Sequence, residues 1–320
     1  MKAIVHTSFG SPDVLEYAEV QKPTEGDDEV LVKVQAASTN PADWHTMRAD
    51  PFFVRLMGDG LLRPKHTILG IDIAGRVEAV GRNVKQFQAG DEVFGTCKWG
   101  GFAEYACASE DRLVTKPAGI TFEQAAAVPV AAITALQGLR DRGKIRPGQR
   151  VLINGASGGV GTFAVQLAKA FETEVTGVCS TRNVDLVRSL GADHVMDYSR
   201  EDVTQSGQRF DLILDAAAYR SVSRYKRAMS ADGIYVMVGG SVGQIFHLMF
   251  LGPWASTTTN KKMSFMMAKI TKEDLLFLRE LLDSGKVKPV IDRRYPLSEV
   301  ADALRYLEEG HARGRVVITM

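Results

Sequence analysis

Midway along the chain a short apolar run, Val151-Leu152-Ile153-Asn154, leads directly into a glycine-rich turn, Gly155-Ala156-Ser157-Gly158-Gly159-Val160-Gly161. The run is typical of a buried strand, and a helical pattern follows it to about Phe171. Read from Ala156, the turn spells A-x-G-x-x-G, the dinucleotide-binding fingerprint with alanine in the first glycine position. Small residues are needed there because a pyrophosphate must reach backbone N–H groups at a helix N-terminus. The turn predicts a dinucleotide site that comprises Ala156, Ser157, Gly158, Gly159, Val160 and Gly161.

Strands and helices alternate through the region around this turn. The expected strands cover residues 151–154, 175–179, 194–197, 212–215 and 235–238. Because these strands are almost continuously apolar, they predict a parallel sheet with helices on both faces, an α/β fold with a Rossmann-type doubly wound sheet. Residues 1 to about 120 instead show short alternating strands separated by glycine and proline, which predicts a β-rich domain. The end of the chain, after residue 290, is expected to return to that domain.

The residues after the second strand indicate which nicotinamide cofactor would bind. An NAD site places an acidic residue about 20 positions after the glycines, where it holds the ribose 2′-hydroxyl. Here the strand runs into Ser180-Thr181-Arg182, and the first acid is Asp185. A guanidinium beside two hydroxyls suits a 2′-phosphate, with charge-assisted hydrogen bonds worth about 1.5–3 kcal/mol each. The sequence therefore favours NADPH, with Ser180 and Arg182 as ligands, although Arg182 could also be a solvated helix-start residue.

The glycine turn also allows a different interpretation. Gly155-x-Ser157-x-Gly159 matches the nucleophile elbow of serine hydrolases, which sits on the same strand-turn-helix unit. Asp215 and either His247 or His311 could complete a triad. This hypothesis leaves Gly161 and the β-rich N-terminal region unexplained, and it stays a minor alternative.

Composition and charge exclude several classes of protein. The 320 residues include 39 basic and 38 acidic side chains, a net charge of +1 that makes nucleic-acid binding unlikely on charge grounds. Three scattered cysteines, Cys97, Cys107 and Cys179, build neither a disulfide framework nor a four-thiolate zinc site. No run of 18 apolar residues predicts a membrane span, and the start of the chain lacks a signal-peptide pattern. A cytoplasmic location is expected.

Several further segments together resemble one known family. They are Ser38-Thr39-Asn40-Pro41-Ala42-Asp43-Trp44, Leu69-Gly70-Ile71-Asp72-Ile73-Ala74-Gly75, Gly90-Asp91-Glu92-Val93, Pro129-Val130-Ala131-Ala132-Ile133-Thr134-Ala135 and His311-Ala312-Arg313-Gly314-Arg315. With the glycine turn, they resemble the zinc-independent quinone oxidoreductases of the medium-chain dehydrogenase/reductase superfamily, over essentially the whole chain. Residues 182–193 look most like the chloroplast and mitochondrial branch, which is linked to quinone and enone reduction.

This resemblance implies a domain organisation and a metal-free site. Residues 1–124 and 287–320 would form a GroES-like catalytic domain, residues 125–286 would form the Rossmann NADPH-binding domain, and the protein would be a homodimer. Where the zinc alcohol dehydrogenases carry ligands, this chain has Asn40 and Ile71, and neither suits zinc. No metal is therefore predicted.

The resemblance also implies roles for individual residues. Asn40 would donate to the substrate oxygen, Asp43 would order the loop, and Thr134 would lie near the nicotinamide. His45 could deliver a proton. Two structural alternatives remain open: Asn40-Pro41 could start a turn, and the His45 ring could pack within its loop.

Other residues are candidates for cofactor binding. Tyr198 matches a position against the adenosine phosphate, or it is an ordinary strand-end tyrosine. Ala216 and Gly239 follow strands whose ends should border the cofactor. Arg313 and Arg315 would reach it from the last loop, or they are surface arginines.

The predicted function is hydride transfer from NADPH to a small apolar quinone or to the activated C=C bond of an α,β-unsaturated ketone. The alternative is a catalytically weak NADPH-binding protein with a regulatory or RNA-associated role. Residues 241–267 are rich in methionine and aromatic residues, which suits a substrate lid, a dimer contact, a membrane contact or core packing.

Overall fold

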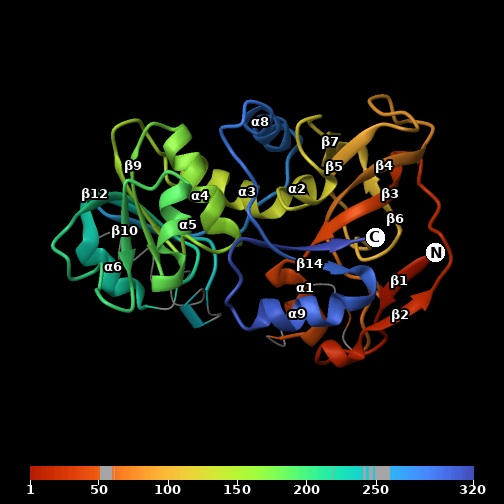
Figure 1. The fold of residues 1–320 in the computed structure, drawn as a ribbon, viewed down its shortest axis with the longest axis horizontal. Coiled ribbons are helices and arrows are strands. Elements are labelled where there is room, and N and C mark those ends of the chain that lie inside the picture. Colours follow the sequence, from red (N-terminus) through yellow and green to blue (C-terminus); the bar gives the residue numbers. More distant parts are fainter. Residues whose placement is uncertain (51–59, 61, 219, 241–242, 245–247, 249–259) are drawn as a thin grey trace. The chain divides into compact units, whose positions relative to one another are not determined.

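The computed structural model describes residues 1–320 except 51–59, 61, 219, 241–242, 245–247 and 249–259 (Figure 1). The described chain divides into two compact units. Unit 1 comprises residues 1–130, 270–285 and 289–320, and unit 2 comprises residues 131–269 and 286–288. The sequence expected boundaries at 124/125 and 286/287. The units differ from this division chiefly at residues 270–285, whose helix contacts strand Leu113–Thr115 of unit 1.

Unit 2 is built on a parallel sheet of six strands. In spatial order they are β10 (His194–Asp197), β9 (Glu174–Cys179), β8 (Arg150–Asn154), β11 (Phe210–Asp215), β12 (Met229–Met237) and β13 (Lys262–Phe265). Every neighbouring pair is parallel. The chain order reverses between β8 and β11, the switch point at which doubly wound sheets bind ligands. The sheet confirms the predicted α/β fold.

Helices cover this sheet in unit 2. Helices α4 (Gly159–Ala170) and α5 (Val184–Ser189) pack on β8, β9 and β10, and α6 (Val222–Ala228) packs on β12 (Figure 1). Helix α3 (Pro129–Gln137) leads into the unit. Helix α4 forms because its apolar residues recur at helical spacing. Phe163, Ala164, Leu167 and Ala168 are buried.

Unit 1 contains a seven-stranded sheet and a hairpin. The path through the sheet is β14 (Ile291–Pro296), β15 (Arg315–Thr319), β3 (Glu29–Ser38), β4 (Asp72–Val80), β5 (Glu92–Thr96) and β7 (Leu113–Thr115), with β6 (Tyr105–Ser109) paired to β3. The hairpin joins β1 (Lys2–Val5) to β2 (Glu16–Glu19). The helices are α1 (Pro41–Arg48), α2 (Phe122–Ala126), α8 (Lys272–Asp283) and α9 (Val300–Glu308). Because β15 pairs antiparallel with β3, the end of the chain returns to the β-rich region, as predicted.

Capping explains where several helices begin. Thr121 and Gln124 form a reciprocal capping box at the start of α2. The sequence interpretation missed α1, although Asn40 at the N-cap, Pro41 at the first position and Asp43 at N3 are a start signal. Residues 241–267, with their four possible roles, fall largely outside the described residues. Within the described ranges, no helix has the length and apolarity needed to cross a membrane.

Candidate functional site

The glycine turn of unit 2 joins β8 to α4 and depends on two of its glycines for its shape. Gly155 adopts a φ of +77°, in the region that favours glycine. At Gly161 a Cβ atom would lie 2.0 Å from the carbonyl oxygen of Gly155, so no other residue fits there. The turn therefore brings the start of α4 close against the end of β8.

Gly158 has a different function in the same turn. It is the N-cap of α4, and it has no side chain that could cap the first helical N–H groups. A Cβ atom here would meet only the carbonyl oxygen of Gly155, at 3.5 Å, so the space in front of the helix is open. The first turn of α4 also carries no acidic residue. An anion can therefore approach these N–H groups, with the helix dipole in its favour.

Asn183, which the sequence interpretation did not single out, ties this turn to the end of β9. Its Nδ2 atom donates to Ser157 Oγ at 2.9 Å and to Ser180 Oγ at 3.1 Å, and its side chain is buried. A serine nucleophile needs a base that accepts its proton, whereas Ser157 Oγ is bound by an amide group that donates to it. Asn183 follows Ser180-Thr181-Arg182 and precedes α5, so its N-cap position was the available signal.

A buried acid, Asp215, shapes the turn after β11. Asp215 accepts hydrogen bonds from Asn154 Nδ2 at 2.7 Å, Tyr235 Oη at 2.7 Å and the backbone N–H groups of Ala217 and Ala218 at 3.2 and 2.6 Å. Burial raises the pKa of Asp215, and these donors oppose the rise. The carboxylate is thus committed to holding the turn and is not available to a hydrolase triad. Of the two histidines proposed for that triad, His247 lies outside the described residues and His311 belongs to unit 1.

The turns after β11 and β12 touch each other at the same edge of the sheet. A Cβ atom on Gly239 would lie 2.9 Å from the carbonyl oxygen of Ala216, and one on Gly240 would lie 2.3 Å from Ala218 Cβ. The backbone N–H of Ala216 donates to the carbonyl of Asn154 at 3.0 Å. Ala216 and Gly239 therefore lie on one continuous edge with the glycine turn.

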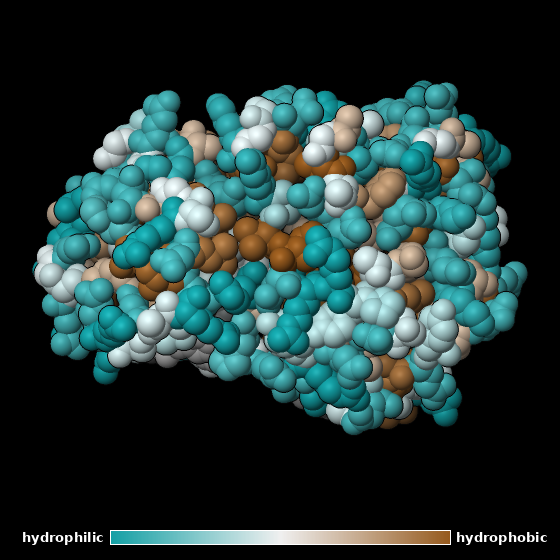
Figure 2. Space-filling view, viewed as in Figure 1, coloured by the Kyte–Doolittle hydropathy of each residue, from teal (hydrophilic) through white to brown (hydrophobic). Residues whose placement is uncertain are grey.

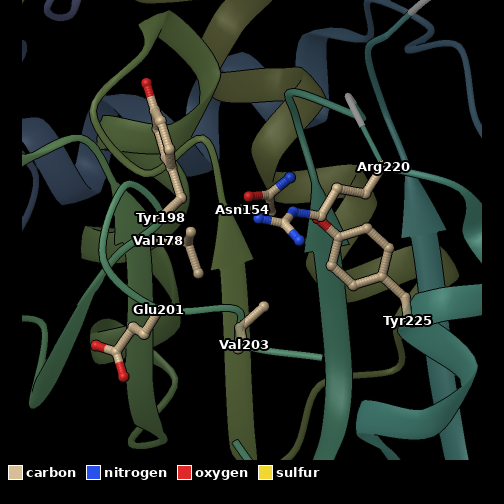
Figure 3. A pocket seen from close by; sticks show the side chains of 7 residues that line it. All are labelled: Asn154, Val178, Tyr198, Glu201, Val203, Arg220 and Tyr225. Atoms are coloured by element: carbon tan, nitrogen blue, oxygen red, sulfur yellow. The ribbon is translucent and has the colours of Figure 1, made fainter. Parts of the chain in front are cut away.

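A cavity of about 280 Å³ opens beside this edge (Figure 3). Its lining comes from Asn154, Val178, Tyr198, Glu201, Val203, Arg220 and Tyr225. Figure 3 shows Arg220 extending from the loop after β11 on the side of Asn154, whereas the Tyr198 ring points away. Arg220 is held by an ion pair with Asp202. Tyr198 and Arg182 are both exposed.

Unit 1 contains a buried cluster of charged and polar side chains. One guanidinium nitrogen, Nη2 of Arg315, donates to Ser38 Oγ at 2.6 Å, to Asp72 Oδ2 at 2.7 Å and to Asn40 Oδ1 at 3.0 Å. Asp72 also accepts from Asn40 Nδ2 at 3.0 Å and from the Val130 N–H at 3.0 Å. These side chains expose at most 5% of their surface. Burial raises the pKa of Asp72, and Arg315 counteracts that rise.

This cluster bears on two of the predicted assignments. Arg315 was expected at the cofactor, but its guanidinium is buried against Asp72, and we no longer assign it there. Asn40 was expected to donate to substrate. One of its N–H groups is bound to Asp72, and the other makes a long contact of 3.4 Å to the Ser38 carbonyl. Only this weaker contact would be given up to a substrate oxygen.

Asp43 and His45 lie on helix α1, beside this cluster. Asp43 accepts from the N–H groups of Asn40 at 2.6 Å and Gly70 at 3.1 Å, and burial raises its pKa to about 7. It thereby joins the start of α1 to the segment before β4. His45 Nδ1 lies 2.6 Å from the carbonyl oxygen of Asp50 and therefore carries the hydrogen, which leaves Nε2 as the accepting atom of the neutral ring.

The two remaining predicted residues belong to different units. Thr134 lies on α3 and is 8% exposed. Arg313 is exposed, and its backbone N–H donates to Asp292 Oδ2 at 2.8 Å.

Comparison with known proteins places the chain. Residues 26–118 match the alcohol dehydrogenase GroES-like domain, and residues 190–318 match the zinc-binding dehydrogenase family. The quinone-oxidoreductase homolog, chloroplastic, of Spinacia oleracea is 35% identical, covering 99% of this chain and 98% of the relative. The chain belongs to the quinone oxidoreductase family of the medium-chain dehydrogenase/reductase superfamily.

Two further relatives show the range of this oxidoreductase family. The NADPH-dependent alkenal/one oxidoreductase, chloroplastic, of Arabidopsis thaliana is 34% identical, over 99% of this chain and 79% of the relative. The solved quinone oxidoreductase from Coxiella burnetii has a TM-score of 0.88 and 30% identity, and the match covers 100% of this chain and 99% of that one. The GroES-like and Rossmann folds expected from the resemblance are thereby confirmed.

Zinc, which one of the matched families carries in its name, does not fit the donor set in unit 1. Asp72 is paired with Arg315, and the cysteine nearby, Cys97, makes contacts of 3.4–3.5 Å to the carbonyl oxygens of Ile71 and Gly70. Within the described part of the chain no three His, Cys, Asp or Glu side chains gather as a metal site would require. A nicotinamide dinucleotide does fit unit 2, because the open space before α4 can receive a pyrophosphate.

Proposed function

We propose that this oxidoreductase uses NADPH to reduce quinones or the activated C=C bond of α,β-unsaturated ketones. The observation that carries the proposal is the open N-terminus of α4 behind Gly158, at the switch point of the parallel sheet. The names of the Spinacia and Arabidopsis relatives support the same reaction class. We further propose a homodimer, on the resemblance alone, and we retain the cytoplasmic location as a prediction from the sequence.

The preference for NADPH rests on the residues after β9. Thr181 Oγ1 donates to Asp197 Oδ2 at 2.6 Å, so this hydroxyl hydrogen is already committed. Ser180 Oγ accepts from Asn183, which leaves its own hydrogen available for an anion. Arg182 is exposed beside it. We assign the 2′-phosphate to Ser180 and Arg182, and the pyrophosphate to the turn from Ala156 to Gly161.

The rest of the chemistry follows from the acceptor and from four predicted site residues. Bound NADPH would supply the hydride. A quinone or enone spreads the developing negative charge over a conjugated system, so the protein needs only hydrogen-bond donors at the acceptor oxygen. We assign that contact to the second N–H of Asn40, with Asp43 holding the Asn40 backbone. His45 is the proposed proton carrier, and Thr134 the proposed neighbour of the nicotinamide.

Oxidation of NADPH, measured at a range of acceptors, tests the proposal. The panel contains ortho- and para-quinones and an alkyl vinyl ketone, with NADH in parallel and a chelator in a second series. We expect acceptor-dependent oxidation that prefers NADPH and survives the chelator. Tight NADPH binding without any turnover would instead support the regulatory or RNA-associated alternative, and loss of activity with the chelator would refute metal-free hydride transfer.

A further inference from the structure

The buried cluster of unit 1 gathers three oxygen atoms around one cation that belongs to the chain. Ser38 Oγ, Asn40 Oδ1 and Asp72 Oδ2 all lie within 3.0 Å of Arg315 Nη2. The four side chains come from β3, the N-cap of α1, β4 and β15, so segments 243 positions apart in the sequence meet here. An ion pair this deeply buried is costly to assemble and gives stability only where its hydrogen bonds are well satisfied. Its presence points to a function beyond packing.

The chemistry of the two charged partners fixes the orientation of the Asn40 amide. A carboxylate only accepts hydrogen bonds and a guanidinium only donates them. Asp72 therefore requires the NH₂ end of Asn40, and Arg315 requires the oxygen end. With neutral partners that can both donate and accept, either orientation of the amide would be satisfied. The ion pair removes that ambiguity.

We propose that Asp72 and Arg315 are positioning residues, which hold the Asn40 amide with one N–H directed so that it can be offered to the acceptor oxygen. This inference rests on the proposed function, because it explains how the donor assigned there is oriented. Asp72 shares its second oxygen with the N–H of Val130 at 3.0 Å, so both of its carboxylate oxygens are fixed. Asp72 and Arg315 act through Asn40 and do not themselves touch the substrate.

A double variant tests the inference without leaving a charge buried alone. In Asp72→Asn/Arg315→Met both charges are removed and the size of each side chain is nearly kept, which is tolerated better than removal of one partner. The new amide at position 72 can pair with either end of Asn40. We expect kcat with a quinone to fall about tenfold, or about 1.4 kcal/mol. The KM for NADPH should change less than twofold, because the assigned cofactor ligands belong to unit 2.

The decisive measurement repeats the change in an Asn40→Ala background. If Asp72 and Arg315 act through Asn40, the double change causes no further loss of kcat once the amide is gone. A purely structural role would give the same loss in both backgrounds. Arg315→Lys is the second variant, because it keeps the positive charge beside Asp72 if the double variant does not fold. It should lower kcat only when Asn40 is present.

A matched control comes from the ion pair between Arg48 and Glu308, which joins positions 260 apart within the same unit at 2.6 and 2.8 Å. Arg48→Met/Glu308→Gln should leave kcat unchanged. The inference is overturned if the control loses as much kcat as the double variant. It is also overturned if the double change lowers kcat equally with and without Asn40, or if kcat is unchanged in both test variants. If the wild-type protein reduces quinones but Asn40→Ala has full kcat, the inference fails and the proposed function stands. If the wild type oxidises NADPH with none of the acceptors on the panel, the inference and the proposed function both fail.

Discussion

Gly158 and Gly161 lie three residues apart in one turn, yet replacement by alanine should chiefly weaken cofactor binding at Gly158 and chiefly lower stability at Gly161. At Gly161 the added Cβ would lie 2.0 Å from the Gly155 carbonyl oxygen and 2.8 Å from Ala156 Cα, both backbone atoms that cannot move aside independently. Overpacking of this kind costs about 1–3 kcal/mol, and the better helix propensity of alanine returns up to about 1 kcal/mol. We expect Gly161→Ala to lower the free energy of unfolding by about 2 kcal/mol.

At Gly158 the added Cβ meets one atom, at an ordinary 3.5 Å. The residue has an extended backbone, with φ −82° and ψ 179°, so alanine fits without strain. Because alanine is a poorer N-cap than glycine, stability should fall by less than about 1 kcal/mol. The methyl group would, however, occupy the space in front of α4. Loss of one charge-assisted hydrogen bond there is worth about 1.5–3 kcal/mol, so the Kd for NADPH should rise roughly 10- to 100-fold.

Urea denaturation and calorimetric titration with NADPH measure the two effects separately. Gly119→Ala is the matched control, because a Cβ there meets nothing within 4 Å and the residue lies in an exposed turn of unit 1. It should change neither quantity. Wild-type NADPH affinity in Gly158→Ala would refute the assignment of the pyrophosphate to this helix terminus.

Three further predictions concern other parts of the site. Arg182→Ala should raise the KM for NADPH about tenfold and leave that for NADH nearly unchanged in steady-state kinetics, and an equal loss with both cofactors would argue against a phosphate contact. Burial raises the pKa of Asp43 to about 7, above the usual value of about 3.9. Protonation of Asp43 therefore stabilises the fold fully below pH 4, and this stabilisation is lost as the pH rises through 7. The difference in unfolding free energy between wild type and Asp43→Asn should therefore decrease from pH 5 to pH 8 in urea titrations, whereas a constant difference would contradict the raised pKa. A fluorophosphonate probe should leave Ser157 unlabelled, since its hydroxyl is bound to Asn183; mass-spectrometric detection of the adduct would revive the hydrolase hypothesis.

Local patterns predicted unit 2 well, because its strands and helices follow one another along the chain. The apolar runs at 151–154, 175–179 and 212–215 became β8, β9 and β11 with ends shifted by at most two residues. The start of α2 is likewise marked by a local pattern, Thr121 followed three residues later by Gln124. In contrast, α1 was missed because Asn40-Pro41 is compatible with both a turn and a helix N-terminus, and only the hydrogen bond from the Asn40 N–H to the Asp43 carboxylate distinguishes them.

The sequence by itself determined the parallel sheet and the glycine turn before α4, and it led to the proposal of NADPH, because each depends on neighbours within a few positions. Only the tertiary structure revealed that Arg315 pairs with Asp72, that Asn183 holds Ser157, and that Asp215 accepts hydrogen bonds from Asn154 and Tyr235. The partners in these contacts come from separate segments, and a charged residue in the sequence looks the same whether it faces solvent or a buried carboxylate. Their burial and pairing follow from the packing of strands that are distant in sequence, and no local pattern encodes it.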